Sequence, residues 1–306
     1  MKNNVPIKIK SIKDFHKLWD LPQPEHPLIS VIDYSQIKHL PENGEVGIIF
    51  DCYAISIKRD LGIKMIYGQQ EYDFDNGVMF FMAPNQLLRI ETNPKIVSER
   101  SGWMLFIHPD FLWNTPLAKS IKQYDFFNYT ANEALFLSEK EEAIVTQTIL
   151  NIQQEYHSNI DKFSQNIIIS QIETLLNYSE RFYQRQFITR KITNHKILDR
   201  LEELLSGYFS NTDTTEKGLP TVQFVADKLN VSSSYLSNLL KSLTGQSTQQ
   251  LIQDKVIEVA KEKLTTTDLS VSEIAYELGF EHSQSFSKLF KTKTNVSPLE
   301  FRQSFN

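Results

Sequence analysis

The chain has 306 residues, of which 41% are hydrophobic and 11% aromatic, enough for a sizeable core and favouring two domains. Its formal net charge of −5 excludes a basic footprint along the whole chain. The lone Cys52 excludes an internal disulfide and a cysteine-rich metal site, and no stretch reaches the ~18 apolar residues of a membrane span. We therefore expect a cytoplasmic protein in a reducing compartment, with no membrane partner.

Short β-rich runs separated by turn signals occupy the region from Val46 to about His108. They read VGIIFDCYAISIKR, IKMIYGQQEYDF, VMFFMAP, LLRIE and GWMLFIHPDFL. Several short strands at close intervals predict a small barrel or sandwich. The aromatic residues of these runs are expected to be mostly core, and a minority of them could line a pocket.

Metal-binding residues are scattered in this region. It has no His-x-His pair, His39 and His108 are isolated, and Glu71 and Asp73 have no histidine beside them. We therefore expect no metal and no cofactor, and we expect His108, which precedes a proline, to be a structural residue at a strand end.

Two helices with apolar stripes are expected next. Ser138 and Glu141 form a capping-box pattern that starts the first helix. Apolar residues then recur at heptad-like steps, at Val145, Ile149, Ile152 and Tyr156, and again at Ile168, Ile172, Leu175 and Phe182. Two interpretations stay open: the stripes pack against the strands, or they form a dimer seam. A basic stretch follows, either touching DNA or solvated, at Arg181, Arg185, Arg190, Lys191, Lys196 and Arg200.

The stretch from Leu269 to Arg302 predicts three short helices. Ser270 and Glu273 form a capping box, and Gly279 supplies the left-handed position that ends the first helix. The second helix, opening near His282, carries Phe286, Leu289 and Phe290 on its inner side. Ser297, Pro298 and Glu300 start the third. Two short helices joined by a tight turn are typical of a helix-turn-helix, although such a hairpin can also serve only for packing.

The same plan occurs about fifty residues earlier, in the stretch TVQFVADKLNVSSSYLSNLLKSLTG from Thr221 to Gly245. Ala226 corresponds to Ala275, and Leu236, Leu239 and Leu240 correspond to Phe286, Leu289 and Phe290. Asn230 stands where Gly279 stands, and asparagine tolerates positive φ. Between the copies, Ser247 to about Thr266 predicts one helix of roughly 20 residues, or about 30 Å. That is close to the ~34 Å between successive major-groove faces, so one chain could place two recognition helices in adjacent grooves.

The candidate DNA contacts follow from the polar face of each second helix. Ser283, Gln284 and Lys288 are candidates for base edges, because glutamine can bind adenine and lysine guanine. Ser234 and Asn238 are their counterparts in the first copy, and Lys241 and Lys291 are candidates for phosphate. For each residue the alternative is a solvated surface side chain. From Lys196 to Asn306 there are 12 basic and 14 acidic residues, so the positive charge is local and the expected salt dependence is modest.

The tail resembles the DNA-binding domain of the AraC/XylS transcription regulators. The resemblance rests on IAYELGF at Ile274 to Phe280, FSKLFK at Phe286 to Lys291 and NVSPLEFR at Asn295 to Arg302. This chain departs from the family pattern at two positions: Asn295 stands where most members have glycine, and Asn238 stands where many members have a basic residue. The order of strands, FFMAPNQ and the later HPDFL resembles the cupin-like sensing domain that precedes this domain in many members.

The resemblance implies an α+β chain with an N-terminal cupin-like β-barrel and flanking helices, followed by an all-α domain with two helix-turn-helix motifs. The expected domains are a sensing barrel at 1–135, a helical dimerisation segment and linker at 136–194, and a DNA-binding domain at 195–306, whose helix-turn-helix core includes Ala226, Leu236, Ala275, Gly279, Phe286 and Phe290. It further implies a transcription regulator, with a small-molecule effector in the barrel, a homodimer, promoter DNA as partner, and RNA polymerase as partner if the protein is an activator. No catalysis is implied. Two alternatives stay open: a barrel enzyme with an accessory DNA-binding tail, and a DNA-binding protein without an effector.

Overall fold

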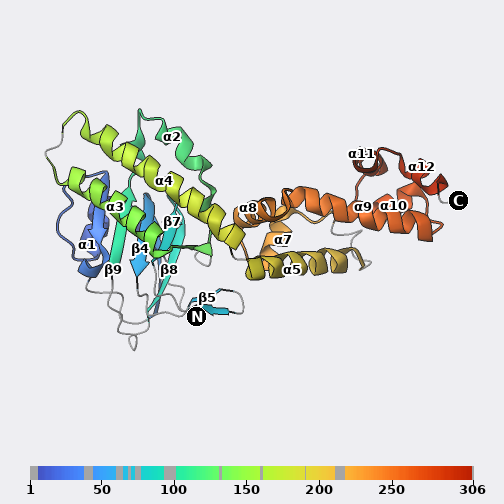
Figure 1. Cartoon of the computed structure of the whole chain (residues 1–306), viewed down its shortest axis with the longest axis horizontal. Coiled ribbons are helices and arrows are strands. Elements are labelled where there is room, and N and C mark those ends of the chain that lie inside the picture. Colours follow the sequence, from blue (N-terminus) through green and yellow to red (C-terminus); the bar gives the residue numbers. More distant parts are fainter. Residues whose placement is uncertain are drawn as a thin grey trace. The chain divides into compact units, whose positions relative to one another are not determined.

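The computed structural model describes residues 6–37, 44–59, 65–67, 70–72, 77–92, 101–130, 133–158, 161–189, 191–210 and 218–304. They divide into two compact units, residues 1–186 (unit 1) and 187–306 (unit 2) (Figure 1). His39, Asp73 and Arg190 lie outside the described residues, as does the side chain of Glu71. None of the helices in the described part of the chain is long and apolar enough to cross a membrane.

Unit 1 is built on β-strands that pair into three sheets. The largest has five strands in the order β10-β7-β4-β9-β2, all antiparallel: β2 (Ile29–Asp33), β4 (Tyr53–Arg59), β7 (Val78–Met82), β9 (Ser101–Ile107) and β10 (Leu135–Phe136). The second has the order β1-β3-β8: β1 (Ile7–Ile9), β3 (Gly44–Phe50) and β8 (Leu87–Thr92). The third pairs β5 (Met65–Tyr67) with β6 (Gln70–Tyr72). The predicted mixture of sheet and helix is thus present, but the described strands do not close into a barrel.

The five-stranded sheet has an outer face covered by helices and an inner face toward the three-stranded sheet. On the outer face, the ring of Phe81 lies 6.1 Å from that of Tyr183 in α4 (Ser164–Thr189). On the inner face, Phe106 of β9 shares a core with Ile48 of β3 and with Phe15 of α1 (Ile12–Leu18). Short helical segments connect these layers: η1 (Tyr34–Gln36), η2 (Pro109–Leu112), α2 (Leu117–Ser120), η3 (Ile121–Gln123) and η4 (Asp125–Asn128).

The two heptad-like stripes are buried within unit 1. In α3 (Glu139–Tyr156), Val145, Ile149 and Ile152 are each 0% exposed, and the stripe of α4 is equally covered. Of the two interpretations of these stripes, packing within the chain is therefore the one that the structure supports. These residues have little apolar surface left for a second chain, so dimerisation by the segment 136–194 stays a prediction that would use its other faces.

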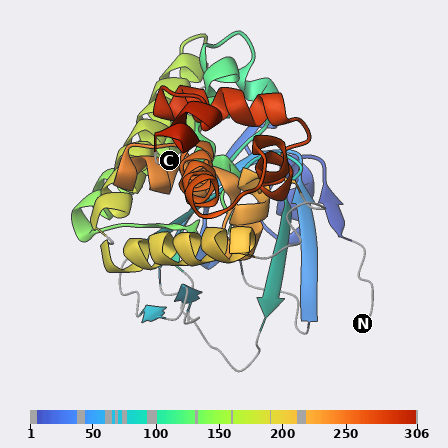
Figure 2. The ribbon, with the colours of Figure 1, turned by 90° about the vertical axis from the view of Figure 1, so that its right-hand side faces the viewer.

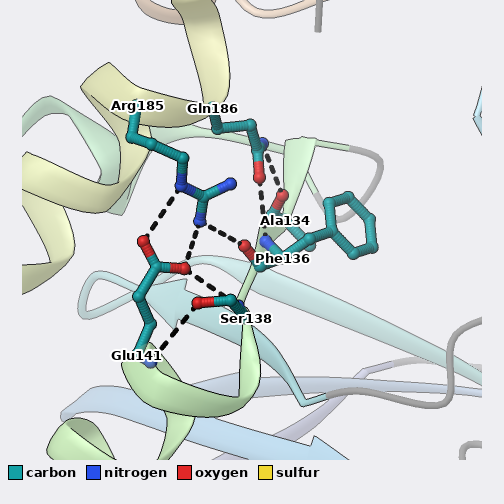
Figure 3. A network of polar contacts seen from close by, with 6 residues as sticks. All are labelled: Ala134, Phe136, Ser138, Glu141, Arg185 and Gln186. Atoms are coloured by element: carbon teal, nitrogen blue, oxygen red, sulfur yellow. Dashed lines mark hydrogen bonds and ion pairs between the residues drawn. The ribbon is translucent and has the colours of Figure 1, made fainter. Parts of the chain in front are cut away.

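Residues at the end of α4 are tied to β10 and to the start of α3 (Figure 3). Gln186, fully buried, accepts a hydrogen bond from the Phe136 amide at 2.9 Å and donates to the Ala134 carbonyl at 3.1 Å. Its side-chain amide thus replaces the strand that edge strand β10 lacks. Arg185 forms an ion pair with Glu141 at 2.6 Å and donates to the Phe136 carbonyl at 2.8 Å. Arg185 is therefore a structural residue of unit 1, and the basic stretch is not uniformly solvated.

Unit 2 is helical. Its helices after α4 are α5 (Lys191–Ser210), α7 (Val222–Leu229), α8 (Ser233–Thr244), α9 (Thr248–Thr266), α10 (Val271–Glu277), α11 (Ser283–Thr294) and α12 (Pro298–Gln303) (Figure 2). The predicted capping boxes are confirmed at Ser138–Glu141 and Ser270–Glu273. The third helix starts at Ser297 as expected, and Ser297 and Glu300 form a further capping box there. The long helix α9 begins and ends as expected, with Ser247 as its N-cap.

Candidate nucleic-acid interface

Two helix-turn-helix motifs, α7–α8 and α10–α11, have the same turn geometry. Asn230 after α7 has φ of 58°, and Gly279 after α10 has φ of 87°. Asn295, which ends α11, also lies in the left-handed region, with φ of 65°. Both asparagines therefore adopt the left-handed conformation that the sequence predicts for them, because a short polar side chain lowers the energetic cost of that conformation.

Gly279 is required for a second reason as well. A Cβ atom on it would lie 2.6 Å from the carbonyl carbon of Gly218 and 2.7 Å from its oxygen. The turn of the second motif therefore packs directly on the backbone of the segment that precedes α7. Tyr208 of α5 holds this segment by donating its hydroxyl to the Gly218 carbonyl at 2.7 Å.

The contacts between the two helices of each motif are made by small and large apolar residues. Ala226 and Leu236 in the first motif, and Ala275 with Phe286 and Phe290 in the second, are each 0% exposed. The alanines leave room for the crossing helix, and the rings of Phe286 and Phe290 fill the core at 5.8 Å from each other. Burying a side chain of this size contributes roughly 1.5–3 kcal/mol. These residues fix the direction in which the polar face of each second helix points.

The central helix α9 joins the two motifs through a polar bridge that sequence reasoning did not find. Asp254 accepts from Lys293, at the end of α11, at 2.7 Å, and from Gln246, just after α8, at 2.9 Å. Lys293 lies in the last turn of α11 with Lys291, and its ammonium is paired with a carboxylate of the same unit. One aspartate therefore links the far ends of both recognition helices.

Arg302 closes the other end of α9. Its guanidinium donates to the carbonyls of Leu264 at 3.1 Å and Leu269 at 2.6 Å. These carbonyls lie at and just beyond the last turn of α9, where carbonyl groups lack helical partners. Arg302, the last residue of the motif NVSPLEFR, therefore stabilises the C-terminal end of α9.

The candidate base and phosphate contacts lie at corresponding positions of α8 and α11. Steps of four and three residues put Ser234, Asn238 and Lys241 on one face of α8, and Gln284, Lys288 and Lys291 on one face of α11. Gln284, Lys288, Lys291 and Lys241 are exposed, whereas Ser234, Asn238 and Ser283 are half-buried. The structure brings each set together on one helix face, and the set on α11 carries two cations against one on α8.

Acidic residues of the same unit are placed at helix starts. Hydrogen bonds from the Ser270 backbone and side chain hold the pKa of Glu273 below its usual value, and those from Ser297 do the same for Glu300. Both carboxylates stay ionised and are used as caps at the starts of α10 and α12. The unit can therefore have no net positive charge and still present cations on α11.

In the part of unit 1 that the structure describes, no group of three metal-ligating side chains is brought together. His108 caps η2 by accepting from the Asp110 amide at 3.2 Å, so its predicted structural role is confirmed. Burial raises the pKa of the Cys52 thiol to about 12, so no thiolate is available. A cavity of about 60 Å³ lies between η2, α3 and α4, lined in part by Phe111, Tyr156 and Ile168.

Comparison with known proteins assigns residues 225–304 to a helix-turn-helix domain family. The chain is 38% identical over 84 residues to the raffinose operon transcriptional regulatory protein RafR of Pediococcus pentosaceus, covering 28% of this chain and 30% of RafR. It is 37% identical over 79 residues to the HTH-type transcriptional activator RhaS of Escherichia coli, covering 26% of this chain and 28% of RhaS. The chain thus spans less than a third of the length of either relative.

Among solved structures, the C-terminal domain of AraT, a response regulator from Geobacillus stearothermophilus, is 34% identical. The alignment covers 35% of this chain and 84% of that one, with a TM-score of 0.31. The helix-turn-helix prediction is confirmed for residues 225–304 by the family match.

Proposed function

We propose that this chain, whose tail is a helix-turn-helix domain of the AraC type, is a transcription regulator that binds promoter DNA. The observation that carries the proposal is the repetition of one exposed polar face. Residues 234, 238 and 241 of α8 recur fifty positions later as 284, 288 and 291 of α11, on helices joined by α9. At 1.5 Å per residue the 19 residues of α9 span about 28 Å, close to the ~34 Å of one turn of B-DNA.

Each of the two helix faces has residues that contact bases and one lysine that contacts a phosphate. Gln284 and Lys288, with Ser283, contact base edges in one major groove, and Ser234 and Asn238 contact bases in the next. Lys241 and Lys291, one turn further along each helix, contact phosphates and set the position of each helix on the duplex. Because only the α11 face has a lysine among its base contacts, the second motif contributes more of the affinity.

Unit 1 acts as the sensing part in this proposal, with a cupin-like arrangement at 1–135 supported by the two facing sheets and their shared core. Residues 136–194 connect it to the DNA-binding domain at 195–306. A homodimer would form through residues outside the buried stripes of α3 and α4. The protein works in the cytoplasm, without catalysis, and contacts RNA polymerase if it activates transcription. An effector that binds one arrangement of the two units better than another shifts DNA occupancy by that difference in affinity.

Selection of bound duplexes from a random pool, at a stated salt concentration, tests the proposal. We expect a site with two short blocks about one helical turn apart. Lys288→Ala should relax one block and weaken specific binding by roughly 1–3 kcal/mol, and Asn238→Ala should relax the other.

The matched control is Lys261→Ala, which removes the same charge from the exposed surface of α9. Equal weakening by Lys261→Ala and Lys288→Ala would reassign Lys288 to non-specific attraction. Absence of any enriched site, with and without cell extract as a source of effector, would contradict the proposed function.

A further inference from the structure

The recognition helix of the first motif is tied to the helix before it by a chain of side-chain hydrogen bonds. The hydroxyl of Ser233, the first residue of α8, donates to Gln223 Oε1 at 2.8 Å. Gln223 lies on α7, and its Nε2 donates to Asp227 Oδ1 at 2.7 Å. Gln223 and Asp227 are exposed, and Ser233 is half-buried. The chain of hydrogen bonds therefore runs over the surface of α7 and ends at the first turn of a recognition helix.

The carboxylate of Asp227 sets the direction of these hydrogen bonds. A carboxylate accepts hydrogen bonds and donates none, so the side-chain amide of Gln223 turns its NH2 group toward Asp227. A glutamine and an aspartate four residues apart on a helix also form a stabilising pair. The amide oxygen of Gln223 then faces Ser233, and the hydroxyl hydrogen of Ser233 is held in the bond to it. Ser233 therefore offers another molecule the lone pairs of its oxygen, which accept hydrogen bonds and cannot donate them.

The second motif does not repeat this arrangement. Counted from the alanine that the two motifs share, Ser272 stands where Gln223 stands. Tyr276 stands where Asp227 stands. In the part of the second motif that the structure describes, the hydroxyl of Ser283 forms no hydrogen bond to α10, so it can rotate to donate or to accept. A serine is thus the first residue of both recognition helices, and the direction of its hydroxyl is fixed in the first motif alone among the described residues.

We propose that Ser233 contacts a base and accepts a hydrogen bond from the exocyclic amino group of adenine or cytosine, with Gln223 as its positioning residue. The first residues of a recognition helix lie at the base edges of the major groove. Adenine and cytosine present an amino donor there, whereas guanine and thymine present acceptors, which would face the lone pairs of Ser233. This inference rests on the proposed function, because it requires α8 to lie in the major groove, and it adds the chemical group that one further residue selects.

Selection of duplexes from a random pool with the full-length wild type and with Ser233→Ala locates the contacted base pair. The block of the selected site that Asn238→Ala relaxes is the first block, and we expect Ser233→Ala to relax one position within it. Every base pair has one amino group in the major groove. A duplex with purine in place of adenine, or 2-pyrimidinone in place of cytosine, lacks that group. Its removal should weaken binding of the wild type by about three- to tenfold and should leave binding of Ser233→Ala unchanged.

A second variant tests the role of Gln223. Gln223→Met nearly keeps the length of the side chain and removes both hydrogen bonds, so the hydroxyl of Ser233 can rotate and donate. Reversing the contacted base pair replaces the amino group by an acceptor. This reversal should weaken binding of the wild type, and it should weaken binding of Gln223→Met less. Gln303→Met, the same change at an exposed position of α12, should respond to the reversal as the wild type does. A residue needed only for folding would change the affinity for both duplexes equally.

Three results would overturn the inference. Ser233→Ala could relax no position of the first block, removal of the amino group could change the affinity of wild type and Ser233→Ala equally, or reversal of the base pair could cost wild type and Gln223→Met the same affinity. In each case the enriched two-block site still supports the proposed function, so the inference alone is lost. If the wild type enriches no site, the proposed function fails, and this inference fails with it.

Discussion

Replacing Gly279 by alanine should damage unit 2 more than the same replacement at Gly245. Both glycines end a helix in the left-handed region, with φ of 87° and 75°. A Cβ at Gly245 would meet nothing within 4 Å, whereas one at Gly279 would lie 2.6 Å from the Gly218 backbone. The left-handed conformation costs an alanine roughly 1–2 kcal/mol at either position. The overlap at Gly279 adds about 1–3 kcal/mol, as overpacking does in cores, so the expected total is about 2–5 kcal/mol.

Urea unfolding of the full-length variants measures this difference. The three tryptophans, Trp19, Trp103 and Trp113, all lie in unit 1, so their fluorescence follows that unit alone. Far-ultraviolet circular dichroism follows the helices of both units. We expect Gly279→Ala to lower the midpoint of the transition seen only by circular dichroism, and to leave the fluorescence transition in place. Equal losses for Gly279→Ala and Gly245→Ala would refute the close packing of this turn on Gly218.

Four further outcomes are expected. Arg302→Lys should destabilise unit 2 by about 1–3 kcal/mol in the same unfolding experiment, because an ammonium lacks the two separate N–H groups with which the guanidinium donates to the Leu264 and Leu269 carbonyls. An unchanged midpoint of the unfolding transition would contradict this role of Arg302. Gln186→Leu removes two buried hydrogen bonds to the backbone of β10 and the residue before it, so it should destabilise unit 1 by about 1–3 kcal/mol per hydrogen bond, read from tryptophan fluorescence. A loss confined to unit 2 would be inconsistent with the network of Figure 3. Burial lowers the pKa of His16 from its usual value of 6.5, so the folded state favours the neutral ring and unit 1 should lose stability as the pH falls below about 6.5. His16→Gln should make the stability of unit 1 depend less on pH in this range. A steeper pH dependence in the variant would contradict this role of His16. Asp254→Ala should weaken binding to a two-block DNA site more than to a single block, and equal weakening would show that the bridge does not orient the two helices.

The helix starts, the turns and the internal repeat could be predicted from the sequence because each depends on residues a few positions apart. A serine and a glutamate three residues later specify a helix start wherever they occur, and glycine or asparagine specifies a left-handed turn. The repeat adds a second copy in which the same positions can be checked. For this reason Asn230 and Asn295 could be assigned their conformations without a structure.

The apolar stripes of α3 and α4 could be predicted as buried but not assigned a partner. Heptad-like spacing shows which face of a helix avoids water, and it does not show whether a sheet or a second chain covers that face. The apolar residues Ile197, Leu201 and Leu205 of α5 give the same kind of signal, and they are buried in unit 2.

Contacts between distant positions could not be predicted from a single sequence. Asp254 and Lys293 are 39 residues apart, and nothing in the spacing of either residue indicates the other. The sequence alone therefore does not show that Asp254 pairs with this lysine of α11.

The most direct test of the account is binding to the selected two-block site after the spacing between its blocks is changed. Because α9 holds both recognition helices within one compact unit, adding about 5 base pairs, half a helical turn, should reduce affinity to that of a single block. Adding a full turn should not restore it, since α9 cannot lengthen. Full affinity at the longer spacing would contradict the central claim, because it would mean that the two blocks are bound by separate chains.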